Sequence, residues 1–401
     1  MDYLNGEEGK LFPRVFGGTL QSIKEPFNVQ SVWIKINRYA REIADEGSYP
    51  RSQFLYMGRF ARANLIAYTV LYDKPSLQPL LKPKTQSDDE FTAELERLVA
   101  DLSKTLYPWM SPTFKSIKDI QTHFQTIPKG KPQEGIIFTT GKWHFELTVH
   151  AIMTLRKVLN CSLPIEVHYG GPSDLTPQMI KAFNALPNTV AIDTVTNYFT
   201  SETKKFGGWS LKPFALLASS FASVIFIDAD ALFFQDPHTL LHSATFAKHG
   251  QVFFHDRSLF RNDPVEWFRG INPHHTHYAS TLRYMNGLSW HEMESGVVVV
   301  DKRVTGNLHA LMAVCNMNSK VERDEVTYKK MHGDKETYWI SWDLLRVPYS
   351  FVPTYGGTVG YKNSTTGAIC GGLFHTDEHQ RPLWWNGGVI ANKHHNKEDN
   401  L

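Results

Sequence analysis

The spacing of apolar residues changes along the chain, and the change falls near residue 130. Before it, apolar side chains recur at helical spacing over residues 54–72 and 91–106, on either side of a proline-rich break. Asp88 and Asp89 are candidate caps of the second helix. The first part of the chain is therefore expected to be helical.

From Gly135 onward, short apolar runs alternate with amphipathic segments. Short runs bounded by turn residues predict strands, and the segments between them predict helices. The expected strands are 136–140, 165–169, 189–193, 224–228, 252–255 and 296–301, and the expected helices are 145–159, 176–186 and 210–220. This alternation indicates an α/β fold, with a parallel nucleotide-binding sheet covered by helices on both faces.

The two patterns predict two domains. An N-terminal helical subdomain is expected over residues 1–130, packed on an α/β domain over residues 131–401. Between the expected strands at 252–255 and 296–301 lies a segment rich in aromatic residues and histidine. Its histidines lack a regular ligand spacing, so a polar loop lining a sugar pocket is favoured over a metal site.

Composition and charge narrow the class of protein. The chain has 401 residues, 42% of them hydrophobic and 20% charged, which is typical of a globular protein. A formal charge of +2 gives no basic surface of the kind that binds nucleic acid, so we expect no nucleic-acid partner. The three cysteines are far apart and lack CxxC spacing, which argues against a zinc site but leaves open one disulfide or three buried thiols.

Signals for targeting and modification are sparse. No apolar stretch approaches the roughly 20 residues of a membrane span, and the first residues lack the features of a signal peptide. We expect a soluble chain that either works in the cytosol or lacks an N-terminal membrane anchor. Asn160 and Asn363 begin sequons that would accept glycans in the secretory pathway.

The strongest chemical signal is a pair of carboxylates at the exit of an apolar strand. Asp228 and Asp230, separated by Ala229, follow the run Val224–Ile227. Ligands of open α/β sheets bind outside the carboxyl ends of the strands, and Mn²⁺ or Mg²⁺ needs only one or two protein carboxylates beside diphosphate oxygens. The alternative is a pair that caps a helix or solvates a turn.

Six motifs then occur in a fixed order. They are GGWSLKPFA at 207–215, IFIDAD at 225–230, FFHDR at 253–257, HEMESGVVVVDK at 291–302, GDKETYW at 333–339 and CGGLFHTDEHQRPLW at 370–384. Together they resemble the fungal α-1,3-mannosyltransferase family over roughly residues 135–387. The resemblance implies a GT-A-like catalytic domain that uses GDP-mannose and Mn²⁺, with Mg²⁺ as an alternative, and retains configuration. It also implies a Golgi-lumenal protein, held in the membrane only through an N-terminal anchor that this sequence does not show.

The resemblance assigns residues around the diphosphate. His375 stands in a His…basic-Pro-x-Trp context, which implies a third metal ligand beside Asp228 and Asp230. Arg381 follows in that motif, where a guanidinium could meet diphosphate oxygens in a bidentate manner. Lys212, 16 residues before Asp228, is expected to face the nucleotide, although it could equally be a solvated helix lysine.

Two further groups complete the expected site. Thr139, Thr140 and Gly141 lie at the end of a strand and resemble the first nucleotide-contacting loop of the family, where glycine allows close backbone approach. Three carboxylates are candidates for the reacting sugar: Glu294 before a buried strand, and Asp334 and Glu336 at the start of a helix. Asp334 could instead serve only as an N-cap. In retaining enzymes of this kind the diphosphate itself takes the acceptor proton, so no single general base is required.

The expected function is transfer of mannose from GDP-mannose to a mannosylated glycan, forming an α-1,3 linkage. The alternatives in the same class are α-1,2-mannosyl transfer and the use of another nucleotide sugar. A non-catalytic glycan-binding subunit and a metal-dependent hydrolase are the alternatives from other classes.

Overall fold

The computed structural model describes the greater part of the chain. The described residues are 41, 54–110, 116–199, 206, 208–258, 265–362, 364–367 and 369–387. Asn363, which begins the second sequon, lies outside them. Within these ranges no helix is both long and apolar enough to cross a membrane.

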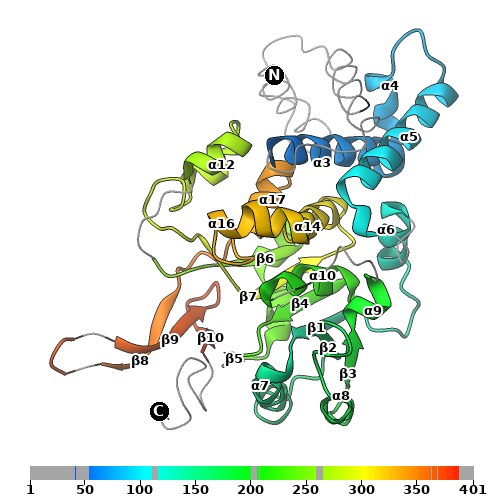
Figure 1. Ribbon diagram of the computed structural model, residues 1–401. Coiled ribbons are helices and arrows are strands. Elements are labelled where there is room, and N and C mark those ends of the chain that lie inside the picture. Colours follow the sequence, from blue (N-terminus) through cyan, green and yellow to red (C-terminus); the bar gives the residue numbers. More distant parts are fainter. Residues whose placement is uncertain are drawn as a thin grey trace.

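A six-stranded sheet forms the centre of the molecule, in the order β3-β2-β1-β4-β7-β6 (Figure 1). Its strands are β1 Glu134–Thr139, β2 Ile165–Tyr169, β3 Thr189–Asp193, β4 Ser223–Ile227, β6 Gln251–His255 and β7 Met293–Asp301. The first four are parallel, whereas β7 is antiparallel to both β4 and β6. The α/β class is confirmed, and the expected parallel pairing holds for β1 to β4. The antiparallel pairing of β7 was not expected, because strand polarity depends on the connections and not on the apolar runs.

A second sheet of four strands, in the order β5-β10-β9-β8, flanks the first. Its strands are β5 Ala231–Phe233, β8 Gly357–Lys362, β9 Ile369–Thr376 and β10 Pro382–Asn386. The strands β8 and β9 extend away from the body of the molecule (Figure 1). Because β5 begins at Ala231, the acidic pair lies at the junction of the two sheets.

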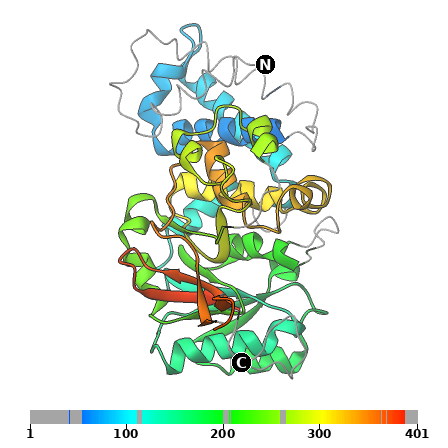
Figure 2. The same ribbon diagram turned by 90° about the vertical axis from the view of Figure 1, so that its left-hand side faces the viewer.

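Helices cover both faces of the central sheet, and the N-terminal helices form a further layer (Figures 1 and 2). The helices of the α/β part are α7 Phe145–Lys157, α8 Pro177–Asn184, α9 Thr194–Tyr198, α10 Leu211–Ala218, α11 Ala244–His249, α12 Val265–Ile271, α13 His277–Thr281, α14 Thr305–Met317, α15 Lys320–Glu322, α16 Tyr328–Lys330 and α17 Thr337–Leu345. The aromatic and His-rich segment expected as a loop thus contains the short helices α12 and α13.

Alternating side chains of the strands divide the core between the two faces. In β4, Val224 and Phe226 pack with the helices α10, α14 and α17, whereas Ile225 and Ile227 pack with α7 and α11. All five residues of β4 are buried. A strand buried on both faces reads as a continuous apolar run, which is why the sequence located it so clearly.

The N-terminal helices are α3 Phe54–Tyr68, α4 Gln78–Leu81, α5 Asp88–Leu106 and α6 Ile117–Gln125. They share one hydrophobic core with α14 and α17. The cap of α5 is Ser87, whose hydroxyl accepts from the backbone N of Glu90 in a capping box, so Asp88 and Asp89 belong to the first turn and are not caps. Because the N-terminal helices share this core with helices of the α/β part, the division of the chain into two domains at residue 130 stays a prediction.

The described cysteines are buried thiols. Cys161 and Cys315 are both free and buried, and the side chain of Cys370 lies outside the described part of the structure. Asn160, which begins the first sequon, is exposed.

His309 links α14 to the N-terminal helices and makes stability depend on pH. Its ring lies against Tyr68 with centroids 4.9 Å apart, and its Nδ1 donates to the backbone O of Thr305 at 2.9 Å. Burial lowers the pKa of His309 to about 4. Between pH 6.5 and 4 the unfolded chain binds a proton there that the folded chain does not, so stability falls as the pH falls.

We therefore predict that His309→Phe makes the free energy of unfolding less sensitive to acid. The wild type should lose roughly 3 kcal/mol from this group as the pH falls from 6.5 to 4, and the variant should lack that loss. Urea denaturation at several pH values measures it. An unchanged slope in the variant would contradict the assignment.

Candidate active site

The carboxyl ends of β1 and β4 meet where the strand order reverses. The chain proceeds from β1 through β2 to β3 on one side of β1, and then places β4 on the other side. Open α/β sheets bind their ligands in the crevice at such a switch point. Residues Thr139–Gly141 lie at the carboxyl end of β1 and residues Asp228–Asp230 follow β4, so both expected nucleotide-contacting segments lie at this edge.

Asp228 is held by a buried lysine. Lys212, in the first turn of α10, places its Nζ 2.9 Å from each oxygen of the Asp228 carboxylate. Burial raises the pKa of Asp228 to about 7, although Lys212 opposes the rise. The pKa of Lys212 is raised, because Asp228 and Asp334 outweigh the effect of its burial. Lys212 is thus a buried cation at the sheet edge and not a solvated helix lysine.

Asp230 joins the two sheets. Its backbone O accepts from the N of Gly387 at 3.0 Å, just beyond the end of β10, and its side chain is buried. The backbone N of Ala231 donates to the O of Asp228 at 3.0 Å, which closes a turn between β4 and β5. The acidic pair is therefore part of a fixed turn rather than the cap of a following helix.

The start of β7 brings Glu294 to the same edge. The backbone N of Asp228 donates to the O of Gly296 at 2.8 Å, so the amino end of β7 lies beside the carboxyl end of β4. Glu294 was expected to precede the strand, but β7 begins at Met293 and includes it. Its position at the crevice edge depends on the antiparallel pairing, which a parallel strand would have reversed.

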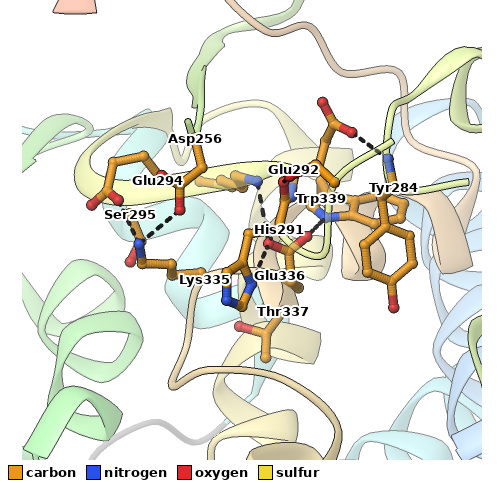
Figure 3. A network of polar contacts seen from close by, with 12 residues as sticks. Asp256, Tyr284, His291, Glu292, Glu294, Ser295, Lys335, Glu336, Thr337 and Trp339 are labelled. Carbon is orange, nitrogen blue, oxygen red and sulfur yellow. Dashed lines mark hydrogen bonds and ion pairs between the residues drawn. The ribbon is translucent and has the colours of Figure 1, made fainter. Parts of the chain in front are cut away.

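Lys335 bridges two buried carboxylates, as Figure 3 shows. Its Nζ lies 2.5 Å from Glu294 Oε2 and 2.9 Å from Asp256 Oδ2. Glu294 Oε1 also accepts from the backbone N of Gly296 at 2.9 Å. Burial alone would raise the pKa of Glu294, but the attraction of Lys335 outweighs it and lowers the pKa to about 2. Glu294 is thus an ionised, firmly oriented carboxylate.

Asp334 is buried beside this pair and does not cap α17. Its Oδ1 lies 3.7 Å from Lys212 Nζ and accepts from Ser295 Oγ at 3.3 Å, while its Oδ2 has no hydrogen-bond partner in the described part of the chain. Burial raises the pKa of Asp334, with Lys212 opposing the rise. Its backbone O, not its carboxylate, serves the helix by accepting from Thr337.

Glu336 is placed differently from the other candidate carboxylates. Its Oε1 accepts from the backbone N of Glu292 and of Met293, at 3.0 and 3.2 Å, and its Oε2 accepts from Trp339 Nε1 (Figure 3). The side chain is fully buried. These bonds hold the amino end of β7 on α17, so the structure places Glu336 as a support behind Glu294.

The loop after β1 is shaped by its own neighbours. Thr139 is half-buried at the strand end, and Thr140 Oγ1 accepts from Thr148 Oγ1 at 2.8 Å. A Cβ on Gly141 would lie 2.5 Å from Asp174 Oδ1. A larger residue at this position would therefore displace the Asp174 carboxylate, which accepts from the backbone N of Gly170 at 2.8 Å.

The expected third metal ligand lies apart from the acidic pair. His375 in β9 stacks on Trp384 with centroids 4.1 Å apart, and its buried Nε2 has no hydrogen-bond partner among the described residues. Burial lowers the pKa of His375 to about 4, so the ring is neutral at pH 7. Yet the described part of the chain contains no group of three His, Cys, Asp or Glu side chains that could hold one metal ion. As placed, Asp228, Asp230 and His375 do not fit a preassembled three-ligand site.

Arg381 lies at the far end of β10. It pairs with Asp377 at 2.8 Å and its side chain is 61% exposed. It lines a pocket of about 340 Å³ together with Asp236 and Glu378. A strand rises about 3.3 Å per residue, so Arg381 lies roughly 20 Å from Gly387 and the acidic pair. The structure does not bring it to the site.

Sequence reasoning gave no role to Lys335 or Asp256, although both lie within the quoted motifs. Asp256 directly follows β6, as Asp228 follows β4. Since β6 and β4 both pair antiparallel to β7, their carboxyl ends lie at one edge. The pattern of a strand followed by aspartate could therefore have identified Asp256 from the sequence. The pairing of Lys335 with Asp256 and Glu294, however, can be recognised only in the folded structure.

Comparisons with known proteins show the family of the chain. The family model described as "Mannosyltransferase putative" matches residues 133–378, more than half of the chain. The chain is 24% identical to "Putative alpha-1,3-mannosyltransferase MNN14" of Candida albicans, over 60% of this chain and 39% of that protein. It is 27% identical to "Alpha-1,2-mannosyltransferase MNN24" of the same organism, over 70% of this chain and 42% of that protein. The chain thus spans half or less of the length of these relatives.

Solved structures are more distant. The mannosyltransferase Ktr4p from S. cerevisiae in complex with GDP is 11% identical, with a TM-score of 0.37, over 60% of this chain and 79% of that one. Glycosyltransferases are also among the other similar structures.

We predict that Lys335→Met destabilises the protein far more than a comparable surface change. Removing Lys335 leaves Glu294 and Asp256 buried without a countercharge, which should cost about 3–5 kcal/mol. Lys320→Met is the matched control, because Lys320 pairs with Asp324 on the surface at 3.2 Å, and such pairs contribute about 0–1 kcal/mol. Urea denaturation at pH 7 compares the two. Equal losses would contradict the role given to Lys335.

Proposed function

The chain belongs to the family described as "Mannosyltransferase putative", and we propose that it transfers mannose from GDP-mannose to a mannosylated glycan. The proposed linkage is α-1,3, formed with retention of configuration, because the ordered motifs resemble the α-1,3 enzymes. An α-1,2 linkage is the second candidate, since a relative of that name aligns with 70% of the chain.

One observation carries the proposal. Two lysines and three carboxylates from four separate segments converge at the switch point of the sheet: Lys212, Asp228, Glu294, Asp334 and Lys335. Transfer from a nucleotide sugar requires stabilisation of a diphosphate leaving group and orientation of an acceptor hydroxyl. The cluster offers cations for the first task and carboxylates for the second, which a glycan-binding subunit without catalysis would not need.

The proposed reaction divides these tasks among the residues. The acceptor hydroxyl oxygen forms a bond to the anomeric carbon while the bond from that carbon to the diphosphate oxygen breaks. The hydroxyl proton passes to the departing diphosphate oxygen. Lys212 would stabilise the charge on the diphosphate, and Asp334 and Glu294 would orient hydroxyls and stabilise positive charge on the ring. Thr139–Gly141, at the end of β1, would face the nucleotide.

A divalent cation is a separate proposal. Asp228, Asp230 and His375 would hold Mn²⁺ or Mg²⁺, and the orphaned Nε2 of His375 supports a ligand role. The side chains do not gather into one site as placed, so the reaction proposed above uses none of the cation's chemistry.

Arg381, in its exposed pair with Asp377, would contact diphosphate only after the β9–β10 turn moved. A Golgi location is likewise proposed, on the motif resemblance alone.

The first test is the reaction itself. Purified protein with GDP-mannose and an α-mannoside should yield GDP and an extended glycan, whose linkage and anomeric configuration NMR would identify.

We predict that Asp334→Asn lowers kcat by about 100-fold, because a preorganised charge at the reacting centre is removed without changing the shape of the side chain. Asp324→Asn, at an exposed carboxylate, should leave kcat unchanged. Wild-type kcat in Asp334→Asn would contradict the role of Asp334.

Metal dependence has its own outcome. If Asp228, Asp230 and His375 gather around a cation when the donor binds, treatment with EDTA should abolish transfer and added Mn²⁺ should restore it, with Asp230→Asn needing a higher Mn²⁺ concentration for half-maximal rate. Isothermal titration of Mn²⁺ into the protein with GDP present measures binding without turnover. Full activity after EDTA treatment would reject the cation while leaving the lysine cluster in place.

A further inference from the structure

An aromatic surface lies beside Asp334 and is not explained by the reaction above. It consists of Trp209, Trp290 and His332, which we name the aromatic platform. Trp209 is 46% exposed, His332 is exposed and Trp290 is half-buried. A large aromatic side chain left exposed at the rim of a site commonly marks a binding surface.

Trp209 is fixed to the candidate site from two directions. It precedes Lys212 by three residues, through the short 3-10 helix Gly208–Ser210 that leads into α10, so both side chains project from neighbouring positions of one helical turn. Its ring also covers Gly333, the residue before Asp334. A Cβ on Gly333 would lie 2.9 Å from the indole, and its φ of +68° also favours glycine.

The other members extend the surface along the same rim. The rings of Trp209 and His332 have centroids 5.0 Å apart. His332 is 6.0 Å from His291, on which Trp290 stacks at 4.6 Å. His291 and Glu292 immediately precede β7 and so lead directly to Glu294 (Figure 3). Trp209 thus marks the Lys212 side of the cluster, and Trp290 is linked to it through His332 and the buried ring of His291.

Polar groups stand next to the platform rather than within it. Asp334 lies one residue beyond Gly333, with an Oδ2 that no described group bonds. A pyranose ring has an apolar face of C–H bonds and a rim of hydroxyls. An aromatic ring takes the face, while a nearby carboxylate accepts from the hydroxyls.

We propose that the aromatic platform holds the terminal mannose of the acceptor glycan, with Trp209 stacked on its C–H face. This inference rests on the proposed function and names the acceptor subsite of the same centre. The acceptor is favoured over the donor nucleotide because the platform borders Asp334 and the approach to Glu294. The nucleotide-contacting loop, by contrast, follows β1. A docked protein partner is the remaining occupant, and the test below separates the three.

The test measures acceptor and donor parameters separately, with α-linked mannobiose and GDP-mannose. Trp209→Ala should raise the KM for mannobiose about tenfold and leave the KM for GDP-mannose within twofold. Trp209→Phe keeps an aromatic face and should stay within about threefold of the wild type. Trp143→Ala is the matched control, since Trp143 is 95% exposed outside the platform, and should not change the KM for mannobiose.

Each failure has a distinct signature. Trp209→Ala with an unchanged KM for mannobiose would overturn the subsite while leaving the proposed function standing. A raised KM for GDP-mannose alone would assign the platform to the donor and overturn the inference. If the KM values for both mannobiose and GDP-mannose were unchanged, the inference would also be overturned, and of the three occupants only a protein partner would remain. Absence of mannosyl transfer by the wild type would reject the proposed function itself. In that case, direct titration of mannobiose into wild type and Trp209→Ala still tests sugar binding, and equal or absent binding would overturn the subsite.

Discussion

The antiparallel pairing of β7 with β4 is the constraint on which the candidate site depends. Ile227 pairs with Val297, and the next backbone bond joins Asp228 N to Gly296 O. The amino end of one strand is thereby fixed beside the carboxyl end of the other. Glu294 and Ser295 reach the edge where Asp228 lies, and Glu336 secures this arrangement by accepting from the backbone at the start of β7.

Burying so many charges at one edge carries an energetic cost that the two lysines only partly offset. Lys335 is shared between Glu294 and Asp256, and Lys212 is shared between Asp228 and Asp334. Burial still raises the pKa of Asp228 and of Asp334. In a site with surplus negative charge and buried cations, a charged ligand that enters can replace a carboxylate as the partner of a lysine. Stability is thus lost where binding and catalysis are proposed to occur.

The second sheet completes the edge from the other side. β5 continues directly from the acidic pair, and β10 returns to it through Gly387 N and Asp230 O. Asn386 donates to Glu294 at 3.3 Å, and Trp384 packs between His375 and Gly296. The C-terminal motif therefore supports the candidate site through its strand ends, while the turn that carries Arg381 lies away from it.

The sequence by itself predicted the six strands of the central sheet and the edge at which the acidic pair lies, but none of the four strands of the second sheet. Continuous apolar runs identified β1, β4 and β7, because a strand buried on both faces is composed mostly of apolar side chains. In β2, by contrast, apolar residues alternate with Glu166 and His168, which are buried and contact each other. The position of Asp228 and Asp230 after a continuous apolar run was equally readable. Tertiary structure alone decided the polarity of β7, the two partners of Lys335 and the distance of Arg381 from the acidic pair. The physical reason is that periodicity reports how each segment is buried, whereas ion pairs and strand neighbours depend on residues far apart in the chain.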